Sequence, residues 1–146
     1  MSEQTGKGAG EDKIVYRELS YKIKEAALAV HNYFGPGFME KVYENALFFK
    51  LCGAGITCRQ QEPLQVYYED GGRKLVVGEY VADIVVDGDI IIEVKATEGL
   101  EKAHFVQVRS YLKATDRRLG LLINFGTSRL GFERVLNAAR REGETD

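Results

Sequence analysis

The apolar residues in the first third of the chain recur at the spacing of an α-helix. A first helix is predicted from Tyr21, with Ser20 as its N-cap, and Gly35-Pro36-Gly37 ends it because proline and glycine interrupt helices. Its inward positions are Ile23, Ala26, Ala27, Val30 and Phe34. A second helix is predicted from Phe38 to about Cys52. Its inward positions are Met39, Val42, Ala46, Leu47 and Phe49.

From Ile56 the pattern changes to the alternation of apolar and polar residues that is typical of β-strands. The alternating positions are Leu64, Val66 and Tyr68. A hairpin turn is predicted at Asp70-Gly71-Gly72, followed by a strand over residues 74–86. Gly78 lies inside that strand and predicts a bulge. A second hairpin then leads to a third strand that ends near Ala96.

The remaining elements are a helix from Glu98 to Ala114, a continuous apolar run from Leu119 to Phe125, a strand from Leu130 to Val135 and a short charged helix. The inward positions of the first of these helices are Leu100, Ala103, Val106, Tyr111 and Leu112. A continuous apolar run is typical of a strand that is covered on both faces. The order ααβββαβ(β)α predicts an α/β domain, with a twisted mixed sheet flanked by helices.

Three charged residues flank the second hairpin, with Asp83 before it and Glu93 and Lys95 after it. A two-residue loop at Asp87-Gly88 would place Asp83 and Glu93 on opposite faces. A three-residue loop, 87–89, pairs Asp83 with Glu93 instead. It also collects five apolar residues on one face, namely Ile84, Val86, Ile90, Ile92 and Val94. Because a slip by one residue would mix polar and apolar positions, the pattern predicts the three-residue loop.

Two carboxylates that face each other repel unless a cation neutralises them. Mg²⁺ and Mn²⁺ prefer oxygen ligands, often one or two carboxylates with waters and substrate phosphate. Asp83 and Glu93 are therefore candidate metal ligands, and Lys95 shares the face of Glu93 and is a candidate to position a water or contact a phosphate. The spacing leaves a second interpretation open, a surface salt bridge between Glu93 and Lys95 with Asp83 as a chance neighbour.

Length and composition fit one globular domain, with 146 residues of which 45% are hydrophobic and 29% charged. We assign residues 1–12 to a flexible N-terminal tail and residues 13–142 to a single domain. Residues 1–100 hold 11 Lys and Arg against 16 Asp and Glu, and residues 101–146 hold 9 against 6. An acidic centre beside a basic surface fits a metal site that also contacts phosphates, although a solvated surface explains the same counts.

No apolar run is long enough to span a membrane, and the start of the chain does not read as a signal peptide. The two cysteines, Cys52 and Cys58, are too few for a disulfide framework. We expect half-buried free thiols in a reducing environment and therefore a cytoplasmic protein.

The segment Gly37-Phe38-Met39-Glu40-Lys41-Val42-Tyr43 has the pattern GxxExxY. With the segments LSYKIKEAALAVHNYFGPGFMEKVYENAL, VGEYVADIVVDGDIIIEVKA and YLKATDRRLGLLINFG, the chain resembles the GxxExxY protein family over about residues 18–136. Members of that family are small bacterial or archaeal proteins of the PD-(D/E)XK nuclease superfamily, so the resemblance implies a nuclease-type α/β core. The chain departs from the superfamily pattern before Asp83, where Val81-Ala82 stands without a proline.

The resemblance also implies roles for particular residues. Asp83 corresponds to the metal-binding aspartate, and Glu93-Val94-Lys95 corresponds to the (D/E)XK element, in which the backbone carbonyl of Val94 adds a ligand. Glu40 resembles the helix glutamate of the exonuclease branch, a further or water-mediated ligand. The run from Gln107 to Tyr111 matches the Gln-x-x-x-Tyr element of that branch.

Structural roles compete with some of these assignments. Glu40 is also suited to stabilise the first turn of its helix, and Gly37 to provide a backbone conformation between helices. Tyr43 is expected to pack in the core more often than to act in chemistry. His104 is expected to be hydrogen-bonded and partly buried rather than in the site, and His31 to be structural.

The sequence thus predicts a Mg²⁺- or Mn²⁺-dependent nuclease that hydrolyses phosphodiester bonds in DNA or RNA. Lys95 would position the attacking water, and Gln107 and Tyr111 would position the substrate. The candidate contacts to the nucleic-acid backbone are Arg109, Lys113, Arg117 and Arg118, although a solvated face explains them equally. The alternative is a catalytically silent nuclease-fold module for binding or regulation, and a homodimer or a partner protein is a further expectation.

Overall fold

The chain is described by a computed structural model that covers the backbone of residues 8–137 and the side chains of residues 16–137. It begins with a long helix, α1 (Gly8–Phe34), so the predicted start at Tyr21 is wrong. The helix extends further because Tyr16 and Leu19 continue its apolar face and pack against the core. Ser20 is therefore not an N-cap but a buried residue inside α1, whose Oγ accepts a hydrogen bond of 2.6 Å from Arg134 Nη1. Residues 8–12, which we assigned to the tail, belong to this helix.

The second helix, α2 (Glu40–Gly53), follows the predicted break at residues 35–37. The prediction that Met39 and Phe49 point inward is wrong, because Met39 is 81% exposed and Phe49 is 69% exposed. Met39 lies before the first helical residue and so does not share the buried face. That face is formed at four-residue spacing by Tyr43, Leu47 and Leu51.

The predicted mixed sheet is confirmed. It contains the strands β1 (Cys58–Asp70), β2 (Arg73–Val86), β3 (Ile90–Lys95), β4 (Leu119–Asn124) and β5 (Gly131–Leu136) in the order β1-β2-β3-β4-β5. Neighbouring strands are antiparallel except β3 and β4, which are parallel and are joined by the crossover helix α3 (Lys102–Thr115). The predicted final helix after Val135 lies outside the described residues. Among residues 8–137, no helix is long and apolar enough to cross a membrane.

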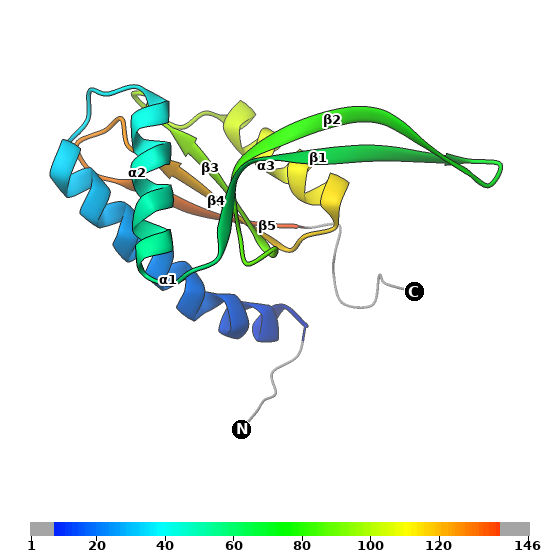
Figure 1. Ribbon diagram of the computed structural model, residues 1–146, viewed down its shortest axis with the longest axis horizontal. Coiled ribbons are helices and arrows are strands. Elements are labelled where there is room, and N and C mark those ends of the chain that lie inside the picture. Colours follow the sequence, from blue (N-terminus) through cyan, green and yellow to red (C-terminus); the bar gives the residue numbers. More distant parts are fainter. Residues whose placement is uncertain (1–7, 138–146) are drawn as a thin grey trace.

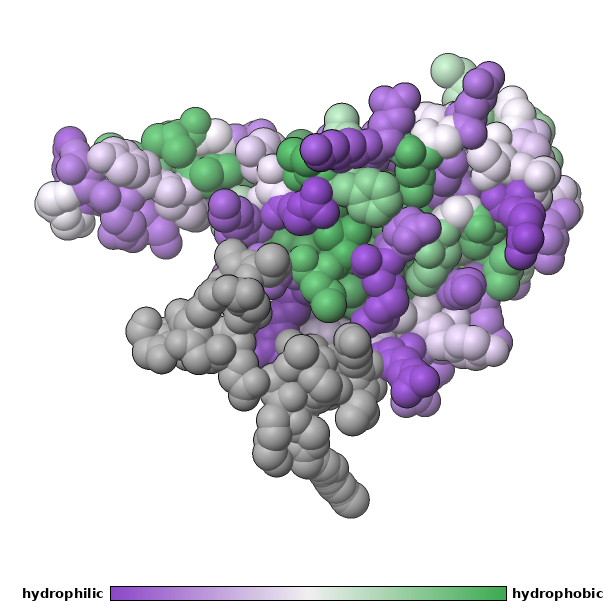
Figure 2. Space-filling view, turned by 180° about the vertical axis from the view of Figure 1, so that it is seen from behind, coloured by the Kyte–Doolittle hydropathy of each residue, from purple (hydrophilic) through white to green (hydrophobic). Residues whose placement is uncertain are grey.

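The strands β1 and β2 continue well beyond the rest of the sheet as a two-stranded arm (Figure 1). The register shifts between Val66 and Tyr67, which pair with Gly78 and Val76, and this confirms the predicted bulge. Seen from behind, the arm carries a hydrophobic surface part-way along its length (Figure 2). Val76 and Val77 are among its exposed apolar residues.

Helices cover both faces of the sheet, with α1 and α2 on one face and α3 on the other (Figure 1). Val86 pairs with Ile90, so the predicted three-residue loop is confirmed, and both Asp87 (φ 57°) and Gly88 (φ 74°) adopt the left-handed conformation. The five apolar residues at positions 84, 86, 90, 92 and 94 all join the core beneath α1 and α2. Val85 and Ile91 point the other way, into a second core beneath α3.

The crossover helix begins four residues later than expected, at Lys102, and Leu100 precedes it. The inward assignments of Val106 and Ala103 are wrong, because Val106 is 47% exposed and Ala103 is also exposed. Val108 is buried instead, together with Tyr111 and Leu112. The strand β4 is buried along its whole length, as the apolar run predicts.

Candidate active site

The carboxylates of Asp83 and Glu93 lie beside each other where β2 meets β3. The backbone N–H of Asp83 donates to Glu93 Oε2 at 2.9 Å, and the backbone N–H of Val94 donates to Asp83 Oδ2 at 2.8 Å. Each side chain is therefore fixed by the backbone of the strand opposite. This arrangement follows from the register of the hairpin, since a shift by one residue would send one carboxylate to the other face.

The surroundings of Asp83 and Glu93 raise the pKa of both carboxyl groups. Glu93 is only 3% exposed, and burial followed by the charge of Asp83 raises its pKa to about 8. Burial also raises the pKa of Asp83, although the N–H of Val94 opposes this effect. Lys95 lowers both pKa values, but its effect is smaller than that of burial. The surroundings of both carboxyl groups therefore favour the protonated form more than water does.

The helix α3 brings two polar side chains to the same site. Lys95 Nζ donates a hydrogen bond of 3.1 Å to Gln107 Oε1, which ties the end of β3 to the helix. Burial, followed by the charges of Glu93 and Asp83, raises the pKa of Tyr111 to about 12. Lys95, Gln107 and Tyr111 thus lie close to the two carboxylates. The ends of β3 and β4, the start of α3 and the start of α2 gather at one end of the sheet (Figure 1).

A third carboxylate, that of Glu44, lies close by on α2, and the sequence pattern did not single it out. Glu44 is 4% exposed, and its charge raises the pKa of both Asp83 and Glu93. Its Oε2 accepts hydrogen bonds from Gln60 Nε2 at 2.8 Å and from Gln61 Nε2 at 2.9 Å. The available signal was its position four residues after Glu40, which places both glutamates on one face of the helix.

The glutamate and the tyrosine of the GxxExxY motif lie in different environments. Glu40 is exposed in the first turn of α2, and its charge raises the pKa of Asp83 less than that of Glu44 does. Tyr43 is fully buried, and its ring stacks on Phe125 with centroids 4.8 Å apart. Its hydroxyl donates to the carbonyl of Gly35 and accepts the N–H of Phe38. Tyr43 therefore packs in the core and holds the connection between α1 and α2.

Arg109 and Lys113 are exposed on α3, but they do not face the carboxylates. Each follows Gln107 or Tyr111 by two residues, which corresponds to a rotation of about 200° around the helix. His104 accepts the N–H of Glu101 at its Nδ1 and completes a capping box, and His31 Nε2 lies 2.8 Å from the carbonyl oxygen of Thr127. Both histidines thus have the structural roles expected of them.

The free oxygen atoms of the two carboxylates are of the kind that a divalent metal binds. Among residues 8–137, no three His, Cys, Asp or Glu side chains are arranged to hold a metal ion by themselves. Asp83 and Glu93 each use one carboxylate oxygen for a backbone N–H, which leaves Glu93 Oε1 and Asp83 Oδ1 for other partners, and Gln61 Nε2 lies 3.5 Å from Asp83 Oδ1. Mg²⁺ is often bound through one or two carboxylates, with waters and phosphate completing its shell. The residues present fit an ion bound in that manner.

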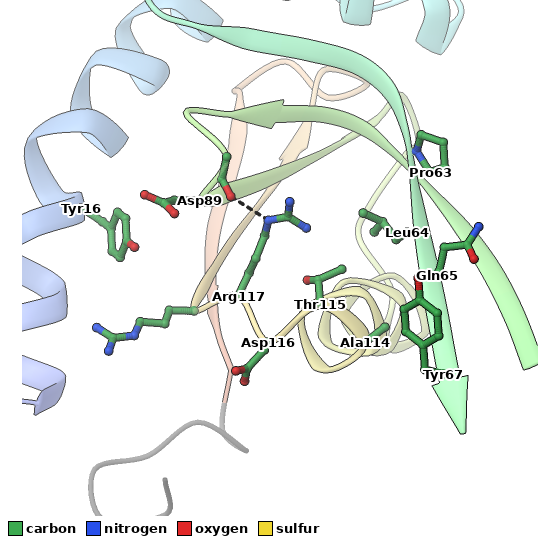
Figure 3. A pocket seen from close by; sticks show the side chains of 12 residues that line it. Tyr16, Pro63, Leu64, Gln65, Tyr67, Asp89, Ala114, Thr115, Asp116 and Arg117 are labelled. Atoms are coloured by element: carbon green, nitrogen blue, oxygen red, sulfur yellow. Dashed lines mark hydrogen bonds between the residues drawn. The ribbon is translucent and has the colours of Figure 1, made fainter. Parts of the chain in front are cut away.

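A separate pocket of about 660 Å³ lies at the other end of β3 (Figure 3). Its lining includes Tyr16, Leu64, Asp89, Thr115 and Arg117. Arg117 Nε donates to the carbonyl oxygen of Gly88 at 2.9 Å, which fixes this side chain to the turn before β3. None of the carboxylates of the candidate site lines this pocket, so it is a distinct cavity.

Comparisons with known proteins agree with this architecture. A family model of the PD-(D/E)XK nuclease superfamily matches residues 17–135. The crystal structure of SSO0001 is similar with a TM-score of 0.54 and 18% identity, and the match covers 86% of this chain. The chain spans 61% of that protein's length, and at this identity the likeness shows the fold alone. No curated protein matches. The family match over most of the chain, with the mixed sheet and flanking helices, shows that the chain belongs to the PD-(D/E)XK nuclease superfamily.

Proposed function

We propose that the chain is a metal-dependent nuclease that hydrolyses phosphodiester bonds in DNA or RNA. The observation that supports this most is the pair formed by Asp83 and Glu93, two adjacent carboxylates whose pKa values are raised mainly by burial. A fold that holds two such groups together gains no stability from their ionisation. A divalent cation would restore the charge balance, and perturbed carboxylates of this kind concentrate at functional sites.

The residues of the site would have different roles in the reaction. Bound Mg²⁺ or Mn²⁺ would lower the pKa of a coordinated water and neutralise charge on the phosphate oxygens. Asp83, Glu93 and the backbone carbonyl of Val94 would hold the ion, with Glu40 as the further ligand that the resemblance implies. Lys95, fixed by Gln107, would orient the attacking water and stabilise the transition state.

Cleavage of single-stranded, duplex and flap oligonucleotides with Mg²⁺ or Mn²⁺ tests the proposal. Asp83→Ala and Lys95→Ala are each expected to reduce the rate by roughly 10²-fold or more. Asp87→Asn and Lys22→Ala are matched controls, because they remove the same charges from exposed positions outside the site. A folded wild-type protein that cleaves none of these substrates would contradict the proposal.

A catalytically silent module for binding or regulation is the second candidate. It is favoured by one observation, the lack of a three-residue metal-ligating cluster among the described residues. Calorimetry with Mn²⁺ separates the two candidates, since no binding at millimolar concentration favours the silent module.

Several finer assignments belong to the same proposal. We assign the chain to the GxxExxY family within the superfamily on its Gly37–Tyr43 motif, and to the cytoplasm on its free thiols. A homodimer or a partner protein would provide substrate selection.

Arg109 and Lys113 would contact phosphates away from the cleaved bond, and replacing either by Ala should reduce the salt dependence of binding without changing metal affinity.

A further inference from the structure

Gln61 has a backbone conformation that its place in a strand does not require. Its φ is +52°, and among the described residues the other non-glycine residues with positive φ lie at a turn, Asp87, and at a helix C-cap, Asp116. On either side the pairing is regular, with Gln60 opposite Ile84 and Glu62 opposite Ala82. The same register places Gln61 opposite Asp83. A left-handed backbone is costly for a residue that has a side chain, and such conformations persist where the surrounding structure imposes them.

The conformation directs Gln61 to the same side as the residue before it. Neighbouring side chains of an extended strand point to opposite faces. Here Gln60 Nε2 and Gln61 Nε2 both donate to the same oxygen, Glu44 Oε2, at 2.8 Å and 2.9 Å. The left-handed backbone at position 61 explains how two consecutive amides reach one acceptor.

The amide of Gln61 also reaches the strand carboxylate. Its Nε2 lies 3.5 Å from Asp83 Oδ1, the oxygen that accepts no backbone N–H. One amide group therefore lies between a carboxylate on α2 and a carboxylate on β2. Lys41 and Gln60 also bind Glu44, but within the described residues neither of them contacts Asp83.

We propose that Gln61 is a positioning residue that holds the carboxylate of Glu44 beside Asp83, so that metal affinity depends on its amide. This inference rests on the proposed function, in which Asp83 and Glu93 bind Mg²⁺ or Mn²⁺. The strained backbone is then retained for the site and not for the stability of the sheet. Removal of the side chain should accordingly separate stability from metal binding.

Gln61→Gly makes this separation measurable. Glycine adopts positive φ without strain, so the melting temperature in EDTA should stay the same or rise. Mn²⁺ affinity measured by calorimetry on the full chain should fall by roughly 10- to 100-fold, as for other residues that orient ligands. Gln61→Asn tolerates the left-handed conformation but is one methylene shorter, and it should weaken Mn²⁺ binding with little change in melting temperature. The paramagnetic resonance spectrum of the remaining bound Mn²⁺ should also change.

Gln65→Asn is the matched control, since Gln65 lies on the same strand and donates a hydrogen bond of 2.8 Å to Glu79 Oε2, away from the site. It should leave Mn²⁺ affinity unchanged. In a Glu44→Gln background, Gln61→Gly should cause little further loss of affinity, because its effect passes through Glu44.

The outcomes separate the two proposals. Loss of Mn²⁺ binding in Asp83→Asn would support the metal site. If Gln61→Gly then binds Mn²⁺ like the wild type, or if it melts at a clearly lower temperature, the proposed role of Gln61 is overturned and the metal site stands. If the wild type binds no Mn²⁺, or binds it equally after Asp83→Asn, both proposals are overturned.

Discussion

Replacing Glu93 with Gln should make the metal-free protein more stable at neutral and alkaline pH. The substitution keeps the shape of the side chain and an oxygen that accepts the N–H of Asp83. It removes a buried charge that stands next to a second carboxylate. The expected gain in stability coincides with a loss of metal binding, because Glu93 is a proposed ligand.

The size of the effect follows from the pKa of Glu93, which is raised from its ordinary value of 4.5 to about 8. The folded state holds the proton more tightly than the unfolded state does. The stability from this group is therefore fully present below pH 4.5 and is lost as the pH rises through 8. At about 1.4 kcal/mol per pH unit, the wild type would lose up to about 4 kcal/mol by pH 8 relative to Glu93→Gln.

Urea unfolding in EDTA at intervals from pH 5 to pH 8 measures this difference. Titrating groups that do not interact with Glu93 affect both proteins equally, so the gap between the two curves reports the titration of Glu93 together with that of the neighbouring Asp83. Glu133→Gln, an exposed position on β5, is the matched control and should show no widening gap. Parallel curves for the wild type and Glu93→Gln, or a less stable Glu93→Gln at pH 8, would refute the reasoning. Saturating Mn²⁺ should stabilise the wild type but not the variant.

Other substitutions test the surroundings of the site. Tyr43→Phe removes a hydroxyl that makes two hydrogen bonds to the backbone between α1 and α2, so urea unfolding should show a loss of about 1–3 kcal/mol. Gly126→Ala would place a Cβ against the backbone nitrogen and oxygen of Thr97, closer than atoms can approach, and the same measurement should show a loss of about 1–3 kcal/mol or more. Burial, followed by a hydrogen bond with Cys52, raises the pKa of the Cys58 thiol to about 12. Iodoacetamide at pH 8 should therefore modify the exposed Cys52 before Cys58, as judged by mass spectrometry, and equal rates would contradict this.

The hairpin was predictable from the sequence because its register is determined locally. Side chains of a strand alternate with a period of two, so the apolar residues from Ile84 to Val94 fit one loop length only. That register then determines where Asp83 and Glu93 lie, and the structure shows the same pairing. The mixed sheet was predictable from the order of the elements, and the apolar run of β4 predicted a strand that is covered on both faces.

The helix boundaries were harder to predict, because tertiary contacts decide them. Ser20 has the chemistry of an N-cap, but its hydroxyl instead binds Arg134 from β5, more than a hundred residues later in the sequence. Met39 and Phe49 are apolar yet exposed, since helical spacing alone does not tell which stripe faces the sheet. Tyr43, which belongs to the motif, marks the correct stripe.

Glu40 and Glu44 show most clearly that the spacing of residues along the chain does not contain the tertiary contacts of a side chain. Four-residue spacing places both carboxylates on one face of α2, and the motif favours the first. Their environments are determined by the contact between α2 and β1, where amides from the strand bind Glu44 and leave Glu40 exposed. One of these amides is that of Gln61, whose left-handed backbone nothing in the residue types predicts. The third carboxylate beside Asp83 is therefore bound by an amide from another element, and a survey of acidic residues along the chain does not find it.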